Sequence, residues 1–356
     1  MPPKLKEENM LKNKKSKSKL LSLVMAIVML VSFLFAGQIP ASALEITTDN
    51  SLMYQEYVKY YLQANENYTP VFTGYKTLLD VDTNEPVAYC FEFNNGYIII
   101  DISAMSVYEY SLSTPSPYLG MNTSALYYNG PIAYYYKLGS DYVHTYAELD
   151  EEGNFTYTVP VNEMSSVISD DAILTDTQKT EKLLSMKSVY ETNATVILAE
   201  GYLSGGLTTA WLNGYCGPTA AHCMLRYMWY TNRSLSTNEV IMTIATYTGR
   251  DVTLDSLRDG MNQYLWSKGY NDTVVSCSYN FNRVMQEINS NEPLSLGQSG
   301  STTGHVMTIH GYKKTQSDTV TTNYYLYVNN SHGSNSVTIT YVNEKPSYLI
   351  DHVYFY

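Results

Sequence analysis

The chain has 356 residues and a formal net charge of −12; 44% of its residues are hydrophobic, 16% are charged and 36 are tyrosines. This composition supports folded domains and excludes intrinsic disorder, collagen and coiled coil as overall classes. The acidic balance argues against nucleic acid as a partner, because nucleic-acid binding requires clustered Lys and Arg. Four cysteines are too few for a disulfide scaffold of this length.

The first 43 residues have the pattern of a targeting segment. Seven lysines lie between Lys4 and Lys19, an apolar run follows from Leu20 to Ala36, and the small residues Ala41-Ser42-Ala43 come next. The pattern predicts a secretory signal peptide over residues 1–43, cut after Ala43, and therefore a secreted, extracellular protein with no further membrane contact. The alternative is an uncleaved anchor that keeps the protein at the cell surface, since the apolar run approaches the length of a spanning helix.

Charge divides the remaining chain into two parts. Residues 44–194 hold 21 acidic and 6 basic residues, a net of −15, whereas residues 195–356 hold 11 and 9, a net of −2. Two units with different surfaces explain this change. We expect an acidic α+β domain at residues 44–160, a polar linker at 161–199 and a second domain at 200–356.

In the first of these domains, apolar spacing predicts a helix at Ser51–Asn65. Asn94-Asn95-Gly96 is a hairpin turn signal between two of the strands that follow. The predicted strands are Tyr75–Leu79, Val87–Phe93, Tyr97–Ile102, Ile132–Lys137 and Tyr142–Glu148. The polar linker contains one predicted helix, Lys179–Tyr190. No group of residues in this half suggests catalysis.

The second domain reverses this order, with helices first and strands last. Helices are predicted from Cys216, from Ser236 (which forms a capping box with Glu239), from Thr253 and over Asn282–Asn289. The predicted strands are Leu294–Gly297, His305–Tyr312, Tyr324–Asn330, Val337–Val342 and Leu349–Tyr356. Helices segregated from a terminal antiparallel sheet predict an α+β fold.

Cys216 is the candidate nucleophile because Cys216-Gly217-Pro218 opens a helix. The partial positive charge and the N–H groups at a helix N-terminus favour thiolate over thiol. The competing interpretation is a buried cysteine at an ordinary helix start. Backbone N–H groups beside Gly217 could hold an oxyanion.

Among the histidines of the second domain, His305 is the best candidate for the acid/base partner. It begins a strand after a turn-rich segment, a position from which a side chain can face a cleft. His222 points away from the start of its helix, and His310, five residues further along the strand, is expected to be structural. Asn330 ends the following strand, and we expect its amide oxygen to accept the His305 ring N–H and so orient the ring.

Three segments together resemble the papain-like cysteine peptidases, in the branch of the bacteriocin-leader (double-glycine) peptidases. They are Asn213–Ala221 around Cys216, Gly304–Tyr312 around His305, and Val328–Gly333 around Asn330. The resemblance covers roughly residues 200–356 and implies a papain-like fold with N-terminal helices and a C-terminal antiparallel sheet. It assigns Cys216, His305 and Asn330 to catalysis.

Two positions depart from that family. Ala210 stands where papain-type enzymes carry the oxyanion-hole glutamine, and His332 takes the place of a tryptophan. The nearest amide side chain is Asn213, so the resemblance assigns the oxyanion hole to Asn213 or to the Cys216 N–H alone.

The first domain is similar, more loosely, to the propeptide of streptopain-like secreted cysteine peptidases. Gly96–Asp101 and Tyr108–Ser111 carry this likeness. It implies a zymogen in which the N-terminal domain acts as an intramolecular inhibitor and is cut away.

The leading hypothesis is a secreted cysteine peptidase that hydrolyses peptide or protein substrates through a Cys216 thioester. One alternative is a papain-fold amidase or acyltransferase acting on cell-wall or other peptides, although the Asp-Cys-Ser-Gly motif of wall-cutting enzymes is absent. Another is a non-catalytic secreted binding protein on a degenerate peptidase scaffold, for which tyrosines would supply contact surface. No metal motif or phosphate loop occurs, so no cofactor is expected. Pairing of Cys223 with Cys277 stays open.

Overall fold

The computed structural model describes residues 50–355 except 123–124, 132, 148–157, 167–172, 208–209, 211, 213, 233, 250–252, 299–304, 318–321, 331–337 and 343–348. The predicted signal peptide lies outside these residues. Asn50–Tyr356 forms one compact unit. None of the helices in the described ranges is long and apolar enough to span a membrane.

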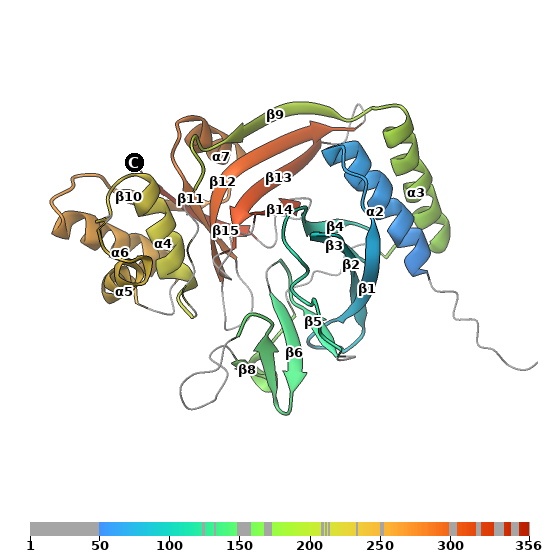
Figure 1. The fold of residues 1–356 in the computed structure, drawn as a ribbon, viewed down its shortest axis with the longest axis horizontal. Helices are drawn as coiled ribbons and strands as arrows, with labels where there is room; N and C mark the ends of the chain where they lie inside the picture. Colours follow the sequence, from blue (N-terminus) through green and yellow to red (C-terminus); the bar gives the residue numbers. More distant parts are fainter. Residues whose placement is uncertain are drawn as a thin grey trace, which may run out of the picture. The chain divides into compact units, whose positions relative to one another are not determined.

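The first half of this unit begins with a helix packed on a curved antiparallel sheet (Figure 1). Helix α2 buries Tyr54, Tyr61 and Leu62 against Phe91 and Ile100 of the sheet. The spacing of the tyrosines along α2 places them on one face, as the sequence predicts. These elements are α2 (Ser51–Glu66), β1 (Phe72–Leu79), β2 (Pro86–Phe93), β3 (Gly96–Asp101) and β4 (Val107–Ser111).

A set of short strands completes the first half and has a small core of its own. Tyr127, Tyr135 and Tyr142 pack there with Val81 and Val159. The elements are β5 (Leu126–Tyr128), β6 (Tyr134–Leu138), β7 (Asp141–His144), β8 (Thr158–Pro160) and a 3₁₀ turn at Val161–Glu163.

Helix α3 and strand β9 connect the halves. Helix α3 (Asp176–Glu191) packs beside α2, and β9 (Val196–Tyr202) pairs with β12 (His305–Gln316) (Figure 1). The predicted helix in this stretch is confirmed and is longer than expected. Strand β9 has no counterpart among the predicted strands. Residue 199 lies inside β9, which pairs with residues more than one hundred positions further along the chain, so local sequence patterns carry no signal for this strand. The domain boundaries remain predictions.

The second half has the predicted order of helices followed by strands. Its helices are α4 (Cys216–Tyr227), α5 (Thr237–Thr248), α6 (Leu254–Ser267) and α7 (Phe281–Asn289). Its remaining strands are β10 (Val274–Ser278), β11 (Leu294–Gln298), β12, β13 (Thr322–Asn329), β14 (Thr338–Val342) and β15 (Leu349–Phe355). The Ser236–Glu239 capping box is present, and Gly249 ends α5 with a φ of 84°. This mixed arrangement is consistent with the predicted α+β peptidase-like fold.

The strands of both halves form one continuous sheet, in which β14 of the second half pairs with β4 of the first. Strand β12 changes partner along its length: His305–Ile309 pair with β11, and Gly311–Gln316 pair with β9. A bulge separates these two segments at His310. A Cβ at Gly311 would lie 2.7 Å from the Tyr202 ring, so only glycine fits where the two backbones approach.

Candidate functional site

Cys216 is the first residue of α4, as predicted, and its side chain is partly exposed. Gly214 has a φ of 70°, a left-handed conformation that lets the chain turn immediately before the helix. The N-cap residue is Tyr215, whose side chain does not cap the helix, and the first turn contains no acidic residue. The thiol therefore lies in the positive field of a helix N-terminus without a competing carboxylate in that turn.

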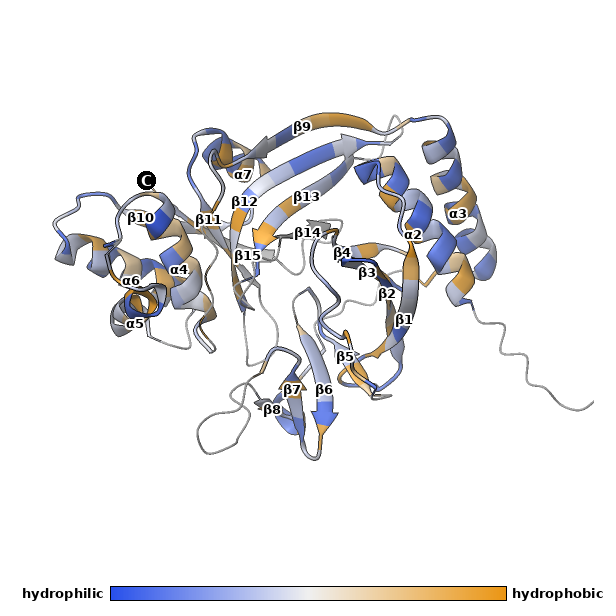
Figure 2. Ribbon diagram, viewed as in Figure 1, coloured by the Kyte–Doolittle hydropathy of each residue, from blue (hydrophilic) through white to orange (hydrophobic). Residues whose placement is uncertain are grey.

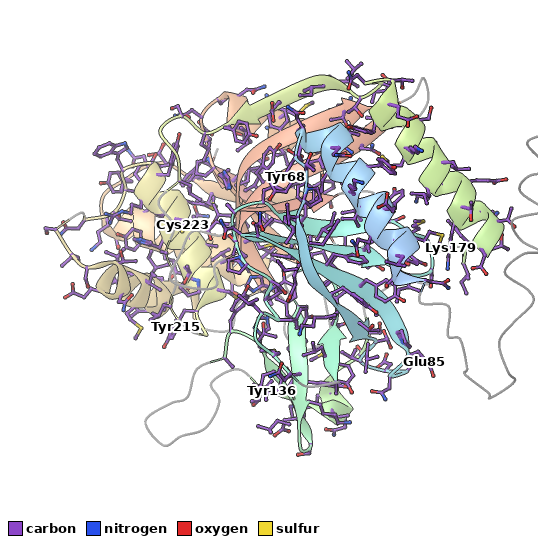
Figure 3. The ribbon with its side chains drawn as sticks, turned by 45° about the vertical axis from the view of Figure 1, so that its right-hand side comes forward. Tyr68, Glu85, Tyr136, Lys179, Tyr215 and Cys223 are labelled. Atoms are coloured by element: carbon purple, nitrogen blue, oxygen red, sulfur yellow. The ribbon has the colours of Figure 1, made fainter. Side chains whose placement is uncertain are left out.

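Helix α4 is held against the sheet close to its start. The Thr308 hydroxyl donates to the Ala220 carbonyl over 3.4 Å. Ala220 lies four residues after Cys216, and Thr308 lies three residues after His305. Further along, the Asn329 amide lies 4.0 Å from the Cys223 sulfur. Figure 3 shows Tyr215 and Cys223 on the same helix, at its start and in its second half. These buried contacts fix α4 across β12 and β13.

His305 and Asn330 are brought together at the ends of β12 and β13. The ring Nε2 lies 2.7 Å from the Asn330 backbone carbonyl oxygen, and both residues are buried. The expectation that the Asn330 amide oxygen accepts this hydrogen bond is therefore wrong for this structure. A carbonyl oxygen only accepts, so Nε2 carries the proton and Nδ1 is the proton-accepting atom of the neutral ring.

Burial controls the charge of His305. Loss of solvent lowers the pKa of His305 to about 4, and the hydrogen bond to the Asn330 carbonyl offsets this only in part. The imidazole is consequently neutral at neutral pH. A neutral ring with Nδ1 unprotonated is the form that can take a proton from a thiol.

Two other histidines of this half have a lowered pKa: His222 is buried, and His310 is half-buried. Burial and the nearby Arg226 lower the pKa of His222 to about 4, and burial lowers that of His310 to about 4. Neither ring nitrogen of His222 has a hydrogen-bond partner among the described residues. His310 occupies the β12 bulge, and its backbone carbonyl accepts from the Leu203 N–H over 2.9 Å.

The cysteines differ in their chemical environment. Burial raises the pKa of Cys223 to about 12 and that of Cys90 well above its usual range, so both thiols are protonated. All four cysteines, Cys277 included, are thiols, and no disulfide joins Cys223 to Cys277. Cys216 and Cys277 are the two that are partly exposed.

Two residues named from the sequence, Asn213 and His332, lie outside the described residues. Conversely, sequence reasoning assigned no role to Thr308 or Asn329, which hold α4 in place. The alternation of side chains along β12 offered a signal for Thr308, since it places Thr308 on the same face as Val306, which packs on α4. Within the described ranges, no three His, Cys, Asp or Glu side chains gather as a metal site would require.

Comparison with known proteins extends these observations to a family. No curated protein matches the chain. Residues 206–350 match the Peptidase_C39 like family, and this stretch contains Cys216, His305 and Asn330. The match supports the predicted relation to the papain-like cysteine peptidases; it does not test the leader-peptidase branch or the propeptide. The second half of the chain is thus similar to a cysteine peptidase family.

Proposed function

We propose that the protein is a secreted cysteine peptidase made as a zymogen, with Cys216 as nucleophile and His305 as acid and base. One observation carries the proposal: the His305 ring is fixed by the Asn330 carbonyl on the same sheet that α4, beginning at Cys216, packs against. The family match over residues 206–350 supports the same reaction class.

In the proposed reaction, His305 Nδ1 takes the proton of the Cys216 thiol as the sulfur attacks the carbonyl carbon of a peptide bond. The tetrahedral intermediate carries its negative charge at the N-terminus of α4, where the Cys216 N–H can donate, and Asn213 is the expected second donor. His305 then gives its proton to the departing amine as the C–N bond breaks, which leaves a thioester on Cys216.

Water completes the cycle. His305 removes a proton from the water molecule that attacks the thioester carbonyl, and the C–S bond breaks. The products are the free carboxylic acid and the regenerated thiol. Throughout, the Nε2–H bond to the Asn330 carbonyl keeps the ring in the tautomer that leaves Nδ1 able to accept.

A time course of the purified 44–356 chain tests this proposal. The wild type should shorten to a fragment that begins between about Lys187 and Gly206, whereas Cys216→Ala should stay whole. Cys277→Ala removes the other partly exposed thiol and should be processed like the wild type. Processing of Cys216→Ala at the wild-type rate, or no processing of any chain, would contradict the proposal.

A further inference from the structure

The first half of the unit (residues 50–166) is bound to the second half (residues 203–355) much more extensively than through the chain that connects them. We propose that it stays bound after the connection is cut, so that the processed protein consists of two associated chains. The physiological cut rests on the proposed function, whereas the binding between the halves does not. A removable inhibitor should dock on a surface that remains stable alone, whereas the first half supplies a partner strand to β14 and part of the core around β13.

The sheet is the first part of this interface. Tyr110 and Glu109 of β4 pair in antiparallel register with Thr340 and Tyr341 of β14. The other strand that pairs with β14 in the described residues is β13. Departure of the first half would therefore turn β14 into an open sheet edge, which folded proteins avoid.

Strand β13 forms the second part of the interface. Residues of the first half belong to the hydrophobic clusters on both faces of this strand. Tyr325 is fully buried among Tyr61 and Phe91 of the first half, and its hydroxyl donates to the Asn65 side chain over 3.0 Å. The next residue, Leu326, points to the other face and belongs to the cluster that contains Tyr97. Apolar burial of this kind supplies most of the affinity of an interface.

A buried ion pair fixes the position of the two halves. The Lys313 ammonium, on β12, is 2% exposed; it pairs with the Glu66 carboxylate and donates to the Asn65 carbonyl over 3.1 Å. The same ammonium lies 4.8 Å from the centre of the Tyr325 ring. A charge buried this deeply needs its counter-charge, so Glu66 at the end of α2 specifies where the first half docks.

The connection itself contributes little to this binding and is accessible. Helix α3 has no buried residue, and Val196, Ile197 and Leu198 of β9 are exposed, which Figure 2 shows as a hydrophobic stretch of that strand. Lys182 of α3 donates to the Ala104 carbonyl over 3.0 Å, so α3 belongs with the first half. Strand β9 pairs with β12 and belongs with the second. A cut in the exposed turn at Asn193 would leave each piece attached to its own half.

An imposed cut tests the proposal without the protein's own activity. The recognition sequence of a site-specific endoprotease is inserted at Asn193 in the 44–356 chain carrying Cys216→Ala, and the cut protein is analysed by gel filtration at micromolar concentration. Both fragments should elute together at the volume of the uncut chain and separate only in denaturant. Separate elution in native buffer would overturn the proposal. If the fragments elute together but the wild-type chain does not process itself, the proposed peptidase activity is contradicted and the proposed association of the halves is not.

A second variant tests the ion pair. Glu66→Gln in the cut protein should weaken the association of the fragments at least tenfold, measured by dilution and gel filtration, because Lys313 loses its counter-charge. The matched control is Glu191→Gln, which removes the exposed partner of Lys187 at 3.7 Å and should leave the association unchanged. Equal affinities for the two variants would refute the role of Glu66 in docking.

Discussion

Glu109 in the first half and His222 in the second are both completely buried, but their surroundings are opposite. Glu109 accepts hydrogen bonds from the phenols of Tyr97, over 3.2 Å, and Tyr134. Within the part of the chain that the structure describes, neither ring nitrogen of His222 has a hydrogen-bond partner, and burial lowers its pKa to about 4.

A second buried pair, Asp101 in the first half and His305 in the second, shows the same contrast in hydrogen bonding. Asp101 of the first half accepts from the Tyr108 hydroxyl and from the Ala104 N–H over 2.8 Å. His305 of the second half is held by one backbone carbonyl and is kept neutral by burial. The difference teaches that carboxylates in the first half organise a tyrosine core, whereas burial keeps the imidazoles of His222 and His305 in the second half neutral.

The largest expected effect is the loss of catalysis when His305 is replaced. His305→Ala should lower kcat/KM for peptide hydrolysis by about 10³-fold or more, because the acid and base of both steps is removed. His310→Ala removes an equally deprotonated histidine five residues away and should change kcat/KM much less. Comparable losses in the two variants would mean that His305 has no special role.

The next effect is on the stability of the first half. Glu109→Ala should lower the free energy of unfolding by about 3 kcal/mol, since two buried phenols lose their acceptor. Glu85→Ala, at an exposed site labelled in Figure 3, should change it by less than about 0.5 kcal/mol. Urea unfolding measures both, and a Glu109→Ala chain as stable as the wild type would show that the carboxylate does not organise this core.

A smaller effect concerns the pH dependence of folding stability that His222 causes. Below its ordinary pKa near 6.5, the unfolded chain binds a proton on His222 that the folded chain does not bind until about pH 4, so stability is lost as pH falls between these values. His222→Leu removes this loss. As the pH is lowered from 7.5 to 5, the free energy of unfolding of the variant minus that of the wild type should therefore increase by about 2 kcal/mol. Urea unfolding at the two pH values measures the change; the same difference at both would contradict the low pKa.

The smallest effect concerns Asn330. Because the backbone carbonyl and not the side chain holds His305, Asn330→Ala should lower kcat less than about tenfold, short of the loss expected from removing a general base. Steady-state kinetics on a peptide substrate provide the value. A loss as large as that of His305→Ala would show that the amide side chain carries the orientation.

Local sequence signals predicted the parts of this structure that depend on neighbouring residues. The Ser236–Glu239 capping box, the Thr253 cap and the hairpin turn before β3 are all confirmed. The same spacing at Thr175–Gln178 forms a capping box at the start of α3 and would have corrected its predicted boundary.

Features that depend on residues far apart in the sequence were not predicted. The bulge at His310 arises where β12 exchanges one partner strand for another, and the β4–β14 pairing joins strands that are far apart in sequence. The acceptor for His305 is a main-chain atom, and residue type gives no indication of where a carbonyl points. The proximity of His305 and Asn330 was therefore predictable from the sequence, whereas the atom that accepts from the His305 ring was not.

The most direct test of the central claim uses a thiol-directed epoxide and iodoacetamide, with labelled cysteines identified by mass spectrometry. A proton donor beside the thiolate speeds the opening of an epoxide, because the epoxide oxygen gains a proton as its C–O bond breaks. Alkylation by iodoacetamide releases iodide and gains nothing from such a donor. The account predicts that the epoxide labels Cys216 far faster than Cys277, and that His305→Ala slows this labelling at least 100-fold while iodoacetamide still reacts. Epoxide labelling of Cys216 no faster than that of Cys277, or unchanged by His305→Ala, would contradict it.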